Sequence, residues 1–575
     1  MAARGGAVHV VTTSREYKGK VYKAHLLRRS YREGDRVKNE TLGNLSHLPD
    51  HVVEMIRRAL KGESFTAVGE AFEITSSAPY GAVKAVTVTM QRLGFAGLLG
   101  SRPCREASLV TAMVSARILA PNTKLATTRW WHSTTLAEDL GISDASEDDL
   151  YAAMDWLLER QPAIEKKLAA RHIDEDSLVL YDLSSSYFEG SKCSLAKLGH
   201  NRDGKKDKLQ VNYGLLTDSR GCPVAISVYP GNTGDAKTLM PQVEKLRQDF
   251  GIKRFAIVGD RGMISQKQID ELRAIDGMDW ITALKNGQIR ALMDAGKIQL
   301  GLFDERNLFE LTHPDFPGER LVACRNPELA KLRAHKRTSL LDATVKELDR
   351  VKRMVERGRL RGQDKIGVRV GRVINKYRVA KHFDLEIENA RFAYRLLDEE
   401  IAAEAALDGI YVVRTSLPKK RLSRDDTVRS YKLLSNVERA FRSIKTIDLK
   451  VRPIHHRLAD RVRSHIFLCM LAYYVEWHMR EAWRPITFAD EDLEAKRTRN
   501  PVAPAKRSDA ADAKASAHAL PDGTPVHSFA TLMADLATIV RNTCRSPSCE
   551  KPFTIATTAT HEQQHALAML AKINL

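Results

Sequence analysis

Cysteine is scarce in this sequence, and no two cysteines form a CxxC pair. Only seven of the 575 residues are cysteine. An odd and scattered set is typical of reduced thiols and argues against a disulfide framework. We therefore expect a protein of a reducing compartment, the cytoplasm.

Long hydrophobic runs are also absent. No stretch of 18 apolar residues occurs, so no segment is expected to span a membrane. The longest apolar run, Ile466 to Val475, is better explained as a buried core helix. The first six residues are followed by polar sequence and include no apolar signal-peptide core. We expect no membrane partner.

Negative charge is in deficit. The chain has 91 Lys and Arg against 72 Asp and Glu, which gives a formal charge of +19. Such an excess favours a polyanionic partner, with nucleic acid first and an anionic membrane surface second. A basic but unspecialised globular protein is the alternative that charge alone leaves open.

The length of the chain exceeds what one hydrophobic core supports, so several domains are expected. We predict an α/β multidomain protein in six regions. They are a small β-rich element (1–65), a helical region that can bind DNA or serve in packing and dimerisation (66–172), the two parts of a mixed-sheet core (173–285 and 403–485), an insertion (286–402), and a basic linker with a helical tail (486–575).

The region 177–285 has a distinct order of elements. Three strand-like runs precede an alternation of helix, strand, helix and strand, which predicts a mixed sheet whose opening meander feeds parallel strands. This is the order of the ribonuclease H-like fold, in which the first and fourth strands are neighbours. The insertion that follows is expected to be strand-rich, with a hairpin at 298–325, a helix at 327–357 and strands at 366–378, 381–388 and 391–397.

Three acidic residues stand in settings that suit metal ligands. Asp182 lies inside an apolar strand-like run, Asp260 ends another, and Glu438 lies on a helical stretch from Tyr431 to Thr446. A carboxylate in a buried strand costs several kcal/mol unless a partner compensates it. A hard divalent cation such as Mg²⁺ is the natural shared partner, because it takes oxygen ligands and substrate phosphates.

The helical stretch carries further polar groups at regular spacing. Tyr431, Glu438 and Lys445 are seven residues apart, so on one continuous helix they share a face, with Arg442 close to it. A phenol and an ammonium beside a metal-binding carboxylate suit the handling of phosphates. An ordinary solvated helix with a Glu–Arg pair is the simpler alternative.

Taken together, these segments resemble the DDE transposases of bacterial insertion sequences, in the branch marked by Tyr-x2-Arg-x3-Glu-x6-Lys. The run from Tyr431 to Lys445 keeps three of the four marks, but Leu434 replaces the arginine, for which Arg439 or Arg442 could substitute. The resemblance covers about 175–285 and 405–480. Its other motifs are Tyr181-Asp182-Leu183-Ser184, Val258-Gly259-Asp260-Arg261-Gly262 and Gly231-Asn232-Thr233-Gly234-Asp235, whose Asp235 we interpret as a helix cap.

The resemblance implies a function and a set of site residues. Asp182, Asp260 and Glu438 would be catalytic and would hold two Mg²⁺ ions, for which Mn²⁺ can substitute, with Asp182 bridging them. No organic cofactor is implied. The enzyme would cut DNA at the terminal inverted repeats and transfer the strand to target DNA, within a homodimeric synaptic complex in the bacterial nucleoid. Expected DNA contacts are Tyr431, Lys445, Arg442, Arg439, Lys205, Lys206, Lys208 and Arg261.

Two other functions remain open. The chain could be an inactive, transposase-derived DNA-binding protein, although the intact acidic triad argues against this. It could also be a ribonuclease H-like nuclease that cuts without joining. The 178 positions between Asp260 and Glu438 argue against that, because they fit the inserted domain of the transposase branch.

Overall fold

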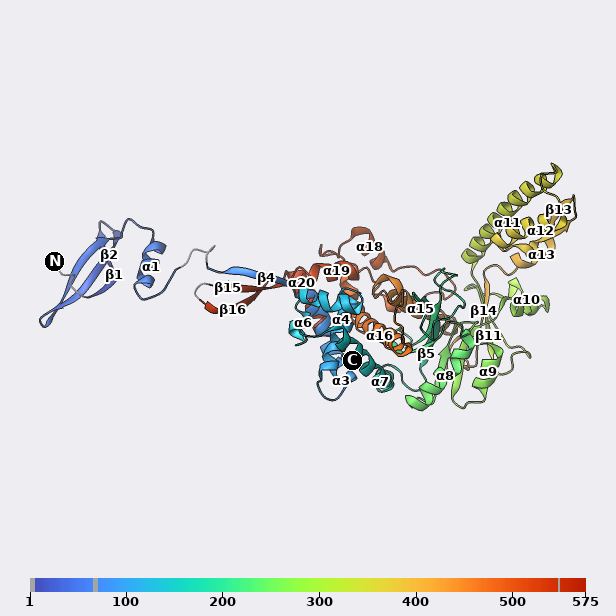
Figure 1. Cartoon of the computed structure of the whole chain (residues 1–575), viewed down its shortest axis with the longest axis horizontal. Coiled ribbons are helices and arrows are strands. Elements are labelled where there is room, and N and C mark those ends of the chain that lie inside the picture. The colour runs from blue at the N-terminus through green and yellow to red at the C-terminus, as the bar shows by residue number, and fades with distance from the viewer. Residues whose placement is uncertain (1–5, 66–70, 547–548, 575) are drawn as a thin grey trace. The chain divides into compact units, whose positions relative to one another are not determined.

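The structure, a computed structural model, describes residues 6–65, 71–546 and 549–574 and divides into two compact units (Figure 1). The first consists of Met1–Ser77 with Arg541–Ala556. The second consists of Ala78–Val540 with Thr557–Leu575. The second unit holds all three of the acidic residues singled out above.

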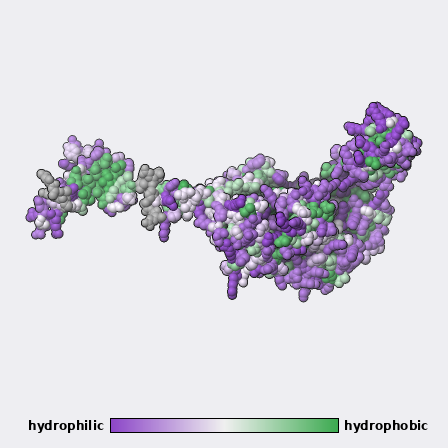
Figure 2. All heavy atoms as spheres, viewed as in Figure 1, coloured by the Kyte–Doolittle hydropathy of each residue, from purple (hydrophilic) through white to green (hydrophobic). Residues whose placement is uncertain are grey.

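The first unit is built from two small antiparallel sheets. Strands β1 (Ala7–Tyr17), β2 (Lys20–Glu33) and β3 (Arg36–Asn44) form a meander, and α1 (Asp50–Ala59) follows it. The turn between β2 and β3 is tight, with Glu33 opposite Arg36. Hydrophobic side chains gather over this meander and α1 in Figure 2, and Leu42 and Met55 are among the exposed ones. The second sheet, in the order β16 (Cys549–Ala556), β15 (Val540–Ser546), β4 (Glu73–Pro79), was not predicted.

The second unit is organised around one mixed sheet of eight strands, in the order β10-β11-β14-β9-β8-β5-β6-β7. Strand β5 pairs in parallel with β8 and antiparallel with β6. The first and fourth predicted strands are therefore neighbours, as expected. The strands are β5 (Leu178–Tyr187), β6 (Gln210–Thr217), β7 (Pro223–Pro230), β8 (Phe255–Val258), β9 (Met278–Ala283), β10 (Leu308–Leu311), β11 (Arg320–Arg325) and β14 (Ile410–Thr415).

Helices cover this sheet and form the largest core. Helix α16 (Ala459–Ala482) is buried from Ser464 to Met479, which confirms the predicted core helix. It packs against α4 (Arg105–Leu119), α7 (Glu147–His172) and β7. Helix α7 begins with a capping box formed by Ser146 and Asp149. The other helices of this region are α2 (Gly81–Arg92), α3 (Phe95–Leu99), α5 (Lys124–Trp130), α6 (Leu136–Asp139), α8 (Leu239–Glu244), α9 (Gln266–Arg273), α19 (Phe529–Leu536) and α20 (His561–Ala571).

The insertion is more helical than the sequence predicted. The expected strand at 366–378 is helix α12 (Gln363–Tyr377), whose Ile366, Val370 and Val373 are buried at helical spacing. Their β-branched side chains favour a strand locally. The segment is nevertheless helical because it packs against α11 (Pro327–Glu356). Strands β12 (Phe383–Ile387) and β13 (Phe392–Leu396) form a separate hairpin, which α13 (Asp398–Ala405) follows.

The insertion leaves and rejoins the main sheet at one point. Strands β11 and β14 pair directly, with Arg325 opposite Ile410. The Asn326 amide then donates to the Gly409 carbonyl at 2.8 Å. Gly409 has φ +75°, and a Cβ atom there would lie 2.3 Å from the Asn326 carbonyl oxygen, so this junction requires glycine. The predicted hairpin at 298–325 adds β10 and β11 to the main sheet and does not belong to the inserted core.

The segment 495–515, predicted to be a flexible basic linker, contains regular structure. Helix α17 (Leu493–Thr498) runs into it, and α18 (Asp509–Ala517) begins with Ser508 as its N-cap. Among the described residues, no helix combines the length and apolar character needed to cross a membrane.

Candidate active site

Asp182 lies in the middle of β5, next to the parallel strand β8. The parallel pairing of the two strands ends with Leu180 opposite Val258, two residues before Asp182 and Asp260, and the charge of Asp260 acts on Asp182. The Asp182 side chain is partly buried, and its Oδ1 accepts a hydrogen bond from the Leu183 amide at 2.8 Å. The strand alternation puts Asp182 and Ser184 on one face of the sheet.

Asp260 follows the last residues of β8, where the chain turns toward α9. Its Oδ1 accepts hydrogen bonds from the amides of Gly262 at 3.0 Å and Met263 at 2.8 Å. This side-chain turn fixes the carboxylate at the carboxyl end of the strand, beside Asp182.

Glu438 comes from a helix that covers the same face of the sheet. The predicted helix from Tyr431 to Thr446 is divided into α14 (Arg424–Lys432), α15 (Leu434–Arg442) and a π-helical turn, η7 (Ser443–Ile447). Helix α15 packs on β5, and the Phe441 ring lies edge-on to Tyr213 of β6 with centroids 5.7 Å apart. Glu438 itself is exposed.

Electrostatics show that these groups share one region. Burial, together with the negative charges of Asp260 and Glu438, raises the pKa of Asp182 to about 7, against the opposing effects of the Leu183 amide and Arg202. Burial and the same three carboxylates raise the pKa of Tyr431 to about 12. The structure thus brings Tyr431 together with the acidic triad.

The donor set suits a hard cation. It consists of carboxylate oxygens, and their mutual repulsion, seen at Asp182, is what a divalent ion would relieve. The three carboxylates are not drawn into a tight cluster, however. Among the described residues, the one group of three potential metal ligands whose atoms all lie within 4.8 Å is His172, Cys222 and His478.

Lys445 is held by an ion pair with Asp203. Its Nζ lies 2.6 Å from Asp203 Oδ1 and donates to Ser184 Oγ at 3.3 Å. Arg452 also pairs with Asp203, whose side chain is 1% exposed. Burial lowers the pKa of Lys445, although Asp203 opposes this effect. The negative charge of Glu438 acts on Tyr431, and the Lys445 ammonium contacts Ser184, which lies two residues along β5 from Asp182.

Arg202 is the residue near the triad that sequence reasoning missed. Its Nη2 donates to both carboxylate oxygens of Asp235 at 2.7 Å, and its positive charge lowers the pKa of Asp182. The interpretation of Asp235 as a helix cap is wrong, because η3 (Asp235–Thr238) has Gly234 at its N-cap and no side-chain cap bond. The sequence showed both Arg202 and the Asp of the Gly-Asn-x-x-Asp motif. It did not show that these two residues pair.

The remaining DNA-contact candidates are mostly solvent-exposed. Arg439 and Arg442 lie exposed on α15, and the exposed Arg261 donates to Asn286 Oδ1 at 2.9 Å. Lys205 and Lys206 are exposed in the loop before β6, where Lys208 pairs with Glu189 at 3.0 Å. Leu434, at the position of the signature arginine, is packed in the main core and 9% exposed.

Comparison with known families identifies the class of protein. A family described as "Transposase DDE domain" matches residues 175–475, which include all three carboxylates, and the chain belongs to this family. A second family, described as "IS1634 family transposase, N-terminal domain", matches residues 10–70. The protein is therefore a DDE transposase of an insertion sequence, an enzyme that cleaves and transesterifies DNA.

More distant comparisons add little. A solved structure described as a piggyBac transposase synaptic complex with hairpin DNA is similar over 81% of each chain, at 8% identity and a TM-score of 0.36. No curated protein matches the chain.

Proposed function

We propose that Asp182, Asp260 and Glu438 are the catalytic metal ligands of this transposase, on a ribonuclease H-like core. The observation that supports the proposal is the parallel pairing of β5 with β8, which ends two residues before Asp182 and Asp260, together with the packing of α15, the helix of Glu438, on β5. The raised pKa of Asp182 supports it, because the negative charges of Asp260 and Glu438 add to the larger effect of burial.

We assign the site to Mg²⁺, with Mn²⁺ able to substitute, and to two ions that Asp182, Asp260 and Glu438 would hold. Bound there, the two ions would clamp the attacking and the leaving oxygens of an in-line displacement at phosphorus. The chain's own groups position the DNA around this centre. Tyr431 presents a phenol beside the carboxylates, and the exposed Arg439 and Arg442 suit phosphate contacts.

The reaction requires no protein nucleophile. Water would cut the strand at the terminal inverted repeat, and the freed 3′-hydroxyl would attack target DNA. The serines after Asp182 serve the structure instead, since Ser184 accepts from Lys445 and Ser186 hydrogen-bonds Tyr213 at 2.8 Å. We further propose that cleavage takes place in a homodimeric synaptic complex, in the nucleoid of a bacterial cytoplasm.

The test is cleavage of a labelled duplex that carries the inverted repeats flanking this reading frame. With Mg²⁺, the wild type is expected to cut at the repeat boundary. Asp182→Asn, Asp260→Asn and Glu438→Gln are expected to bind the duplex in a gel shift yet lose cleavage by at least about 10³-fold. The matched control is Asp207→Asn, an exposed carboxylate of the loop 201–208 that should retain full activity.

Each alternative function has its own outcome in the same assay. Cleavage retained by all three variants would refute the assignment of the site. Specific binding without cleavage by the wild type would favour an inactive DNA-binding protein. Cut products that never join to target DNA would favour a nuclease.

A further inference from the structure

A second cluster of metal-binding side chains lies in the same unit as the carboxylates but uses none of them. His172 ends α7, Cys222 precedes β7, and His478 lies near the end of α16. One ligand atom from each lies within 4.8 Å of the other two. We propose that His172, Cys222 and His478 form a binding site for one zinc-class divalent ion, distinct from the carboxylate site.

The spacing of the ligand atoms suits such an ion. Cys222 Sγ lies 3.9 Å from His478 Nε2. Tetrahedral zinc, with bonds of about 2.3 Å to sulfur and about 2.0 Å to nitrogen, holds these two atom types about 3.5 Å apart. A shift of about 0.4 Å would therefore complete this pair of bonds. Two imidazoles and a thiolate are ligands that zinc prefers over Mg²⁺.

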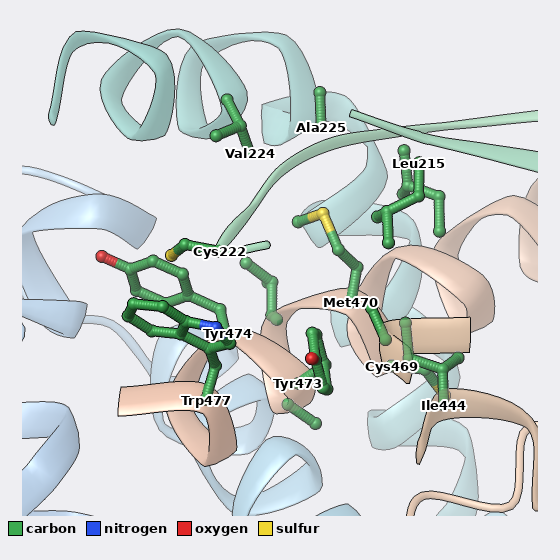
Figure 3. Close-up of a cluster of buried hydrophobic side chains, with 14 of the residues drawn as sticks. Leu215, Cys222, Val224, Ala225, Ile444, Cys469, Met470, Tyr473, Tyr474 and Trp477 are labelled. Atoms are coloured by element: carbon green, nitrogen blue, oxygen red, sulfur yellow. The ribbon is translucent and has the colours of Figure 1, made fainter. Parts of the chain in front are cut away.

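The buried imidazole ring of His478 has few hydrogen-bond partners. Within the described part of the chain, the weak contact with the Cys222 thiol is the one hydrogen bond of its ring, which is otherwise packed against Tyr474, Trp477 and His172. Figure 3 shows Cys222, Tyr474 and Trp477 gathered at one end of the buried cluster. A buried imidazole with so weak a partner is poorly compensated unless a further ligand binds it.

The neighbouring groups hold the ligands in place. His172 Nε2 lies 3.0 Å from the Tyr474 hydroxyl, an outer contact of the kind that orients a metal-binding imidazole. The Cys222 amide donates to Asp218 Oδ1 at 2.9 Å, and this carboxylate adds a nearby negative charge. Arg220 opposes a cation, since its Nη2 lies 3.3 Å from His172 Nδ1. Its side chain is 61% exposed, so it can turn into solvent when an ion binds.

The protonation states are compatible with binding. Burial lowers the pKa of His172 to about 4 and that of His478 to about 3, so both imidazoles are neutral at pH 7 and keep a lone pair for a metal. Burial also raises the pKa of the Cys222 thiol. Binding therefore breaks the S–H bond, forms a metal–sulfur bond and releases one proton to solvent. The ion would tie α7, β7 and α16 together, which is a structural role.

The experiment is a cobalt titration of the full chain after removal of metals with a chelator. With one equivalent of Co²⁺ the wild type is expected to show a thiolate-to-cobalt charge-transfer band, which Zn²⁺ abolishes and excess Mg²⁺ leaves in place. The band should be lost in Cys222→Ala and retained in Cys469→Ala, a matched control at another buried cysteine of the same core. It should also persist in Asp182→Asn, which separates this site from the proposed active site.

A second measurement, thermal unfolding, tests the proposal even if a variant folds poorly. Zn²⁺ should raise the unfolding temperature of the wild type and of Cys469→Ala, and it should not raise that of His478→Ala. Absence of the band from the folded wild type would overturn the proposal, as would a band that survives in Cys222→Ala.

Discussion

Asp182 combines partial burial with two neighbouring carboxylates, and this combination has a consequence for stability. Its pKa is raised to about 7 in the folded protein, while an unfolded Asp titrates at about 4. The folded state therefore holds more protons between these values, and this group lowers stability as pH rises through the window. Above pH 7 the full destabilisation caused by the ionised Asp182 side chain is present.

We predict that Asp182→Asn stabilises the protein at pH 8, in the absence of divalent ions, by roughly 1–3 kcal/mol. The gain should shrink as the pH falls from 7 toward 4, because Asp182 then becomes protonated in the folded protein. Urea unfolding at pH 8 and pH 5 measures both values. Asp207→Asn, at an exposed site, should change stability by less than about 0.5 kcal/mol at either pH. Equal gains for Asp182→Asn at both pH values would contradict the assigned ionisation.

Asp203 is the residue that holds Lys445 near the site. Asp203→Asn would leave the buried Lys445 ammonium and the Arg452 guanidinium without their shared negative charge. We expect a loss of about 3 kcal/mol in the free energy of unfolding, measured with urea. Glu189→Gln removes the partner of Lys208 in an ion pair that is far more exposed, and it should cost at most about 1 kcal/mol. Similar losses in the two variants would argue against a special role for Asp203.

At the scale of single residues, the sequence indicated which side chains suit a metal site. It did not indicate which residues form ion pairs with one another. The acidic residues were recognisable because a carboxylate inside an apolar strand is costly. Lys445 was expected to face phosphate, yet a carboxylate 242 positions away in sequence neutralises it. Such a partner is set by tertiary contact, which local patterns do not encode.

At the scale of elements, the insertion has a core of its own. Leu348 of α11 is fully buried among residues of α11, α12, β12 and β13, and none of them belongs to the main core. We predict that Leu348→Ala costs about 2–5 kcal/mol and that the loss is confined to residues 327–405. Hydrogen exchange read by mass spectrometry should show faster exchange there and unchanged protection in α16 and β5.

The control for this prediction lies on the same helix. Leu332 is 67% exposed, so Leu332→Ala should leave exchange unchanged throughout. Faster exchange of β5 in Leu348→Ala would show that the two cores unfold together.

Elements with one clear periodicity were predictable, and those decided by packing were not. The strands β5 to β9, the capping box of α7 and the buried run of α16 all follow from local pattern. Helix α12 was mistaken for a strand because its β-branched residues favour one. Strand β4 was missed because its partner, β15, lies more than 450 positions away in sequence, whereas β15 and β16, which were also missed, form a local hairpin.

At the scale of the whole molecule, the charge of +19 predicts steep salt dependence of DNA binding. If about 6–10 phosphates are contacted, affinity should fall by about 10³–10⁵ between 50 and 200 mM salt. Replacing both Lys205 and Lys206 by Gln should reduce the slope of log K against log salt by about 2. Fluorescence anisotropy with labelled duplex measures it.

A matched pair of lysines separates this effect from a general loss of charge. Lys419 and Lys420 are equally exposed but lie outside the loop 201–208. Replacing both by Gln should leave the slope unchanged. The same decrease in both double variants would show that Lys205 and Lys206 contact no phosphate of their own.

The junction between β11 and β14 makes the inserted segment modular. The chain leaves after Arg325 and returns at Ile410, and the two strands are already paired there, with a hydrogen bond from Asn326 to Gly409 closing the gap. The inserted segment of some eighty residues therefore branches from the main sheet and is attached to it at a single point. We expect that a segment of different length inserted at this point would leave the pairing of β5 with β8 unchanged.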